Sequence, residues 1–111
     1  MTYKITLINP PQVFTKSQSA SSVIPPLGIM YLASYLLKHG YTVQIIDALG
    51  EAPTNVISFK KKALLRGLSF EEIIKRIDFD TKLIGICNLF SFAYPAVEIL
   101  CKKIHQSHPD K

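Results

Sequence analysis

Three short apolar runs divide this chain of 111 residues and predict three β-strands. They are rich in isoleucine, leucine and valine, and they lie at residues 5–8, 42–47 and 83–89. Continuous runs of this kind, without polar alternation, are typical of strands buried on both faces of a parallel sheet. The first run must end at Asn9, because the two prolines that follow it have no amide proton to donate to a strand ladder.

Segments with helix-start signals follow the apolar runs and predict three helices, the first of them apolar around most of its circumference. The first helix opens at Pro25 and Pro26, since proline suits a first turn whose amide protons lack partners. It ends before Gly40, which favours a left-handed cap. A capping box beginning at Ser69 starts the second helix, and Pro95 starts the third, which carries apolar residues at helical spacing.

Alternation of strands and helices predicts a parallel α/β sheet with right-handed crossovers. We expect one domain over residues 1–111 with a flavodoxin-like, doubly wound (Rossmann-like) sheet of strand order 2-1-3. It would be an incomplete domain that lacks strands 4 and 5. The segments 12–23 and 48–68 are expected to be irregular, because their polar, proline and glycine residues break both periodicities.

Composition narrows the class of protein. A hydrophobic content of 48% excludes intrinsic disorder. The net charge is +5, and the only dense cluster of basic residues lies at 60–62. No aromatic residues interleave with this cluster, so we expect a solvated surface and no nucleic-acid partner. The apolar stretch 27–37 is too short to span a membrane. Cys87 and Cys101 lack metal-ligand spacing and predict buried free thiols, so we expect a cytoplasmic protein without a membrane partner.

Doubly wound sheets bind ligands at the carboxyl ends of their strands, where successive connections leave on opposite faces. With order 2-1-3, that point lies between the first and third strands. The loop after Asn9 has no glycine for a dinucleotide pyrophosphate, and Asp47 is expected to cap its strand rather than bind a ribose. His39, His105 and His108 follow helix ends, which lie at the opposite edge of the sheet.

The chain also resembles a known family. The likeness is carried by residues 4–11, 25–36 and 40–48, and it continues in residues 67–69, 85–86 and 94–96. These segments look like the opening of the N-terminal cobalamin (vitamin B12)-binding domain of cobalamin-dependent radical S-adenosylmethionine proteins. The combination of an Asn-Pro-Pro turn with a Pro-Pro-Leu-Gly helix start is its most specific part.

The resemblance implies a corrinoid partner held over the strand ends. Its binding residues would be Asn9, Pro10, Pro11, Leu27, Gly28, Cys87, Asn88, Leu89, Ser91 and Tyr94. The wider family's Asp-x-His-x-x-Gly motif is replaced by residues 9–14, which implies a base-off cobalamin whose cobalt has no protein histidine ligand. Gly28 would either leave room for the ligand or allow close packing of helix on strand.

The same resemblance implies that this chain is not catalytic by itself. Radical chemistry requires an iron–sulfur cluster and S-adenosylmethionine, which belong to a separate radical domain in cis or in trans. Two other functions stay open on sequence grounds. One is a nucleotide- or sugar-nucleotide-binding half-domain of a transferase, and the other is a protein-interaction domain that pairs through the free edge of the third strand.

Overall fold

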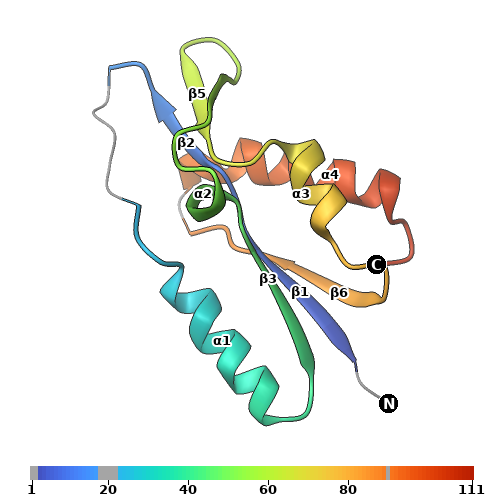
Figure 1. Ribbon diagram of the computed structural model, residues 1–111. Helices are drawn as coiled ribbons and strands as arrows, with labels where there is room; N and C mark the ends of the chain where they lie inside the picture. The colour runs from blue at the N-terminus through green and yellow to red at the C-terminus, as the bar shows by residue number, and fades with distance from the viewer. Residues whose placement is uncertain (1–2, 18–22, 90) are drawn as a thin grey trace.

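A three-stranded parallel sheet lies at the centre of the computed structural model, which describes residues 3–17, 23–89 and 91–111 (Figure 1). Its strands are β1 (Lys4–Asn9), β3 (Thr42–Asp47) and β6 (Thr81–Ile86). They lie in the order β3-β1-β6, with both pairs parallel, which confirms the predicted order 2-1-3. The central strand is the most deeply buried, because it has a neighbour on each side and helices on both faces.

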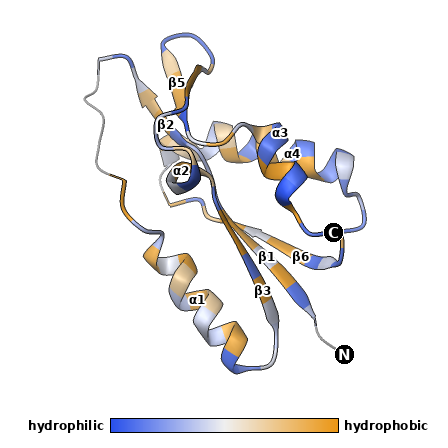
Figure 2. Cartoon of the chain, in the orientation of Figure 1, coloured by the Kyte–Doolittle hydropathy of each residue, from blue (hydrophilic) through white to orange (hydrophobic). Residues whose placement is uncertain are grey.

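Helices cover the two faces of this sheet unequally. The helix α1 (Leu27–Lys38) packs mainly on β1 and β3, where Ile29 and Ala33 meet Ile5 and Leu7. The helices α3 (Phe70–Arg76) and α4 (Tyr94–Ser107) lie on the opposite face and form the larger core. Hydrophobic residues line the middle of the sheet and much of α1 (Figure 2). The expectation of strands covered on both faces is therefore wrong at β6, where Leu83 is 51% exposed beyond the reach of α1.

Local signals at the helix ends act as the sequence predicts. The Ser69 hydroxyl accepts a hydrogen bond from the Glu72 amide, and the Glu72 carboxylate accepts one from the Ser69 amide, each at 3.1 Å. At the end of α1, Gly40 has a φ of 90° and the Tyr41 amide donates to the carbonyl of Leu36. That conformation needs glycine, and it turns the chain directly into β3.

A second, antiparallel sheet corrects the prediction of irregular segments. It consists of β2 (Gln12–Thr15), β4 (Val56–Ser58) and β5 (Ala63–Arg66) in the order β2-β5-β4. The short helix α2 (Ala48–Glu51) connects β3 to this sheet. A small core of Phe59, Leu65 and Ala96 joins the antiparallel sheet to the first turn of α4.

The cysteines and the third strand differ from expectation. Both cysteines are free, but only Cys87 is part-buried, whereas Cys101 of α4 is exposed. The third strand begins at Thr81 and ends at Ile86, so the residues 87–89 lie beyond it and not within it. In the described part of the chain, no helix combines the length and apolar character needed to cross a membrane.

Candidate site at the carboxyl edge of the parallel sheet

The carboxyl edge, where β1, β3 and β6 end, is the place where the predicted ligand site should lie. Ile8 of β1 pairs with Ile86 of β6, and the Cys87 amide donates to the Ile8 carbonyl at 3.0 Å. The loops after β1 and β6 therefore leave the sheet side by side. Since the chain after β1 reaches α1 on one face and the chain after β6 reaches α4 on the other, this is a topological switch point.

The first of these loops is held by its own hydrogen bonds. Asn9 donates from Nδ2 to Oδ1 of Asp47 at 2.8 Å, which joins the ends of β1 and β3. The same carboxylate oxygen accepts from the Gly50 amide at 3.0 Å and caps α2. Asp47 is thus a capping residue, as expected. The Asn9 amide lies at the predicted site, and one of its two N–H donors is committed to this contact.

The two prolines after Asn9 connect β1 to β2 and are largely removed from solvent. Pro11 is fully buried and Pro10 is part-buried. Since β2 begins directly after Pro11, residues 12–15 of the segment predicted to be irregular form a strand. Pro10 and Pro11 therefore fix the direction in which the chain leaves β1. Because they have no amide proton, they could contact a ligand through their rings but could not donate backbone hydrogen bonds to it.

Exposed apolar side chains come from the start of α1 and from the chain after β6. Leu27 is 60% exposed and Leu89 is 75% exposed. Tyr94, the first residue of α4, is also exposed, and so is Phe92 in the short 3-10 helix η1 (Ser91–Ala93). Phe92 was not among the predicted site residues, although its position between Ser91 and Tyr94 was a usable signal. Exposed apolar groups gathered at one edge are typical of a binding surface.

The surroundings of Gly28 exclude one of the two proposed reasons for a glycine at this position. A Cβ atom built on this residue would meet nothing within 4 Å. Close packing of helix on strand is therefore wrong as the reason for the glycine. The alternative, that it leaves room for a ligand, stays a prediction.

The remaining predicted residues differ in exposure. Cys87 packs against the core beneath α1, so its side chain faces that layer rather than open solvent. Asn88 and Ser91 are exposed. A hydrogen bond to the Glu98 carboxylate raises the pKa of the Tyr94 hydroxyl above its usual value of 10, so this residue is a neutral donor.

All three histidines lie away from the carboxyl edge. His39 follows the end of α1, just before Thr42, which pairs with the first residue of β1. His105 and His108 lie at the end of α4, which leads to the region around Phe79, before β6 begins. Among the described residues there is no group of three histidine, cysteine, aspartate or glutamate side chains that could hold a metal ion.

Comparison with known proteins gives one informative similarity. The chain is 32% identical over 91 residues to the cytidylyl-2-hydroxyethylphosphonate methyltransferase of Streptomyces wedmorensis. The matched region covers 79% of this chain and 17% of that methyltransferase. No protein-family model and no solved structure matches the chain. The shown relationship is therefore a distant, partial homology to a methyltransferase.

Proposed function

We propose that this chain is the cobalamin-binding part of a methyltransferase-type radical S-adenosylmethionine protein and is not catalytic alone. The corrinoid would lie over the carboxyl edge, between the start of α1 and the chain that follows β6. The observation that carries this proposal is the exposure of Leu27, Leu89 and Tyr94 around the end of the adjacent strands β1 and β6. Partial homology to a methyltransferase supports the reaction class.

The residues at this edge suit a broad and mostly apolar ligand. Leu27 and Leu89 can cover the face or rim of a macrocycle, while Tyr94 adds an exposed aromatic ring. Because Gly28 has no side chain and the space beside it is open, such a ligand could approach the backbone at the start of α1. When bound, the corrinoid would supply the group-carrying chemistry, and the protein would supply placement.

The position of the histidines favours a base-off form. None of the three lies at the carboxyl edge, so the chain would hold the corrinoid by shape, backbone and apolar contact. The sheet supports a flavodoxin-like interpretation in which two further strands would complete the fold. A radical domain carrying the iron–sulfur cluster would then lie in cis or in trans.

Titration with hydroxocobalamin, followed by visible absorbance, tests the proposal on the full chain. We expect a saturable spectral change in the micromolar range. Leu27→Asp should weaken it by about tenfold, because an unpaired charge would be buried under the ligand. Leu37→Asp is the matched control, since Leu37 is equally exposed (57%) at the far end of the same helix.

This titration, together with a thermal-shift measurement with cytidine monophosphate, separates the corrinoid from the nucleotide-binding alternative. The absence of a spectral change at high micromolar concentration would overturn the corrinoid proposal. If cytidine monophosphate instead raised the thermal midpoint of unfolding, the nucleotide-binding alternative would replace it. Equal losses in the Leu27 and Leu37 variants would place the binding surface elsewhere on α1.

A further inference from the structure

The ends of β1 and β3 carry a polar pair whose hydrogen-bonding groups are only partly used. Asn9 and Asp47 are register partners, and one N–H of the Asn9 side chain donates to Oδ1 of Asp47 at 2.8 Å. A side-chain amide has a second N–H donor and a carbonyl acceptor. Among the described residues, Asp47 is the only hydrogen-bond partner of the Asn9 side chain. One donor and the acceptor of Asn9 therefore remain for a ligand.

This pair lies on the face of the sheet that α1 covers. Ile5 and Leu7 pack against α1, and the alternation of side chains along a strand places Asn9 on the same face. Since α1 ends just before β3 begins, its first residues lie toward the carboxyl edge (Figure 1). The space beside Gly28 is open there. Asn9 is thus on the side of the carboxyl edge where the start of α1 would meet the proposed corrinoid.

The Asp47 carboxylate is fixed in place, and its charge is not neutralised. Its Oδ1 atom also accepts a hydrogen bond from the Gly50 amide at 3.0 Å. A Cβ atom on Gly50 would collide with this carboxylate, so the glycine permits the close contact. In the part of the chain that the structure describes, no lysine or arginine forms an ion pair with Asp47. A group bound to the second N–H of Asn9 would therefore lie beside a fixed negative charge.

We propose that Asn9, positioned by Asp47, binds a carboxamide group and discriminates against a carboxylate at the same place. This inference rests on the proposed corrinoid function, and the group would be a propionamide at the periphery of the corrin. A carboxamide can accept from the second Asn9 N–H and donate to the Asn9 carbonyl, whereas an ionised carboxylate can only accept.

Charge repulsion adds to this mismatch. Two acceptors bound to the same amide nitrogen, each at about 2.9 Å, lie about 5 Å apart. A ligand carboxylate on Asn9 would thus be about 5 Å from Oδ1 of Asp47, close enough for two negative charges to repel each other at a partly solvated site. Asp47 is therefore a positioning residue that also sets the charge preference of the site.

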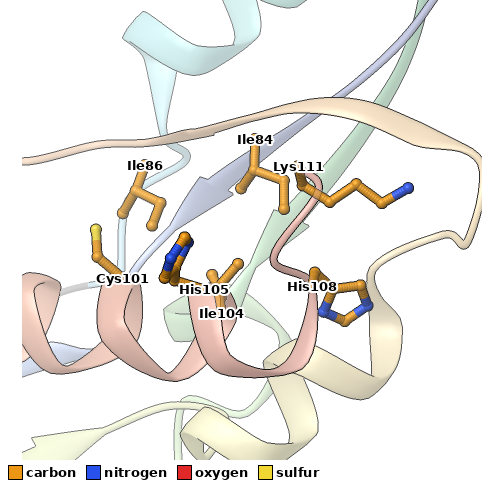
Figure 3. Close-up of a pocket in the computed structure, with 7 residues that line it drawn as sticks. All are labelled: Ile84, Ile86, Cys101, Ile104, His105, His108 and Lys111. Carbon is orange, nitrogen blue, oxygen red and sulfur yellow. The ribbon is translucent and has the colours of Figure 1, made fainter.

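A hollow on the opposite face of the sheet is the place from which binding must be distinguished. It has a volume of about 310 Å³ between β6 and α4, and Ile84, Ile86, His105 and His108 are among its lining residues (Figure 3). Ile84 and Ile86 pack against the core formed by α3 and α4, so this hollow does not share a face with Asp47. A corrinoid held there would not respond to a change at Asp47.

Hydroxocobalamin and its three propionate derivatives, in each of which one propionamide is replaced by a propionate, test the inference on the full chain. Visible absorbance at neutral pH follows binding. We expect at least one monocarboxylate to bind about tenfold more weakly than hydroxocobalamin. In Asp47→Asn, that monocarboxylate should regain most of its affinity, while the affinity for hydroxocobalamin changes by less than about threefold. Asparagine keeps the acceptor for Asn9 and is an equally good helix cap, so a purely structural role of Asp47 predicts no such gain.

Asp78→Asn is the matched control. Asp78 carries the same charge at the opposite edge of the sheet, where it pairs with Lys4 at 2.9 Å, so its loss should leave the ratio of the two affinities unchanged. Circular dichroism checks that both variants keep their secondary structure, and the ligand preference of the unmodified chain is decisive even where Asp47→Asn does not fold.

The outcomes separate this inference from the function on which it rests. If hydroxocobalamin binds and all three monocarboxylates bind equally well, the carboxamide site is wrong and the corrinoid proposal stands. The same holds if Asp47→Asn restores no affinity, or if Asp78→Asn restores as much. If no corrinoid binds, both proposals are overturned.

Discussion

Gly67 is the position at which an added side chain should damage the structure most. Its φ is +130°, a region that residues with a Cβ atom rarely occupy. A Cβ atom here would lie 2.6 Å from the carbonyl oxygen of Ala48 and 2.9 Å from its carbonyl carbon. That carbonyl cannot easily retreat, because it accepts a hydrogen bond from the Leu68 amide at 2.8 Å, while the Gly67 amide donates to Asn55.

Two separate costs add in the Gly67→Ala variant. Holding a non-glycine residue in this conformation costs about 1–3 kcal/mol, and overpacking a buried site against backbone costs about 1–3 kcal/mol more. We therefore expect a loss of about 4 kcal/mol in the free energy of unfolding. A small domain has only about 5–15 kcal/mol to lose, so the variant should be close to unfolding. Equilibrium urea unfolding, followed by circular dichroism, measures the loss.

Gly85→Ala is the control for this reasoning. Its Cβ atom would lie 3.0 Å from a terminal methyl group of Leu7, which can move, and its φ lies outside the left-handed region. We expect it to cost less than about 1.5 kcal/mol. If Gly67→Ala lowers the free energy of unfolding by no more than Gly85→Ala does, the close approach of Gly67 to the Ala48 carbonyl at the start of α2 is not present in solution.

The remaining predictions concern one open glycine, one helix cap and one buried pair. Gly28→Ala should raise the free energy of unfolding by up to about 1 kcal/mol while weakening hydroxocobalamin binding; a loss of stability in urea would contradict this. Ser69→Ala should cost about 1 kcal/mol in the same assay, and a neutral result would show that the cap is absent. The Ser69 backbone amide holds the pKa of Glu72 below its usual 4.5. A carboxyl group whose pKa is lowered in the folded state stabilises the protein fully above pH 4.5, and this contribution is lost as the pH falls through the folded-state pKa. Glu72→Gln should therefore make the free energy of unfolding less dependent on pH in the acid range. Thr6 and Thr81 are fully buried with their hydroxyl oxygens 2.7 Å apart, and the Thr6 hydroxyl also donates to Gln44, so Thr6→Val should cost about 1–3 kcal/mol; an unchanged urea midpoint would refute these bonds.

The parallel sheet was predictable because its signals are local. The strand 42–47 matches β3 at both ends, since Gly40 ends the preceding helix and Asp47 begins the next. The antiparallel sheet was not predictable in the same way. Its strand β2 pairs with β5, about fifty residues later in the chain, and the β4–β5 turn has Lys60 and Lys62 at positive φ instead of the usual glycine or asparagine.

The location of the candidate site was also predictable, but the roles of its residues were only partly so. Topology alone places the ends of β1 and β6 together, and the structure does the same. The hydrogen bond between Asn9 and Asp47 depends on the register of β1 against β3, which the sequence does not encode locally. Asn9 consequently has less to offer a ligand than its position in the sequence indicates.

The hydrogen-bonding groups at the carboxyl edge indicate which kinds of ligand could bind there. A phosphate site needs free backbone amides, usually from a glycine-rich turn or a helix start. After β1, Pro10 and Pro11 have no amide proton, and the Asn9 side chain donates to Asp47. The edge presents the exposed apolar side chains of Leu27 and Leu89 together with the polar residues Asn88 and Ser91. These exposed leucines are consistent with the proposal of a ligand bound through broad apolar contact, such as a corrin ring.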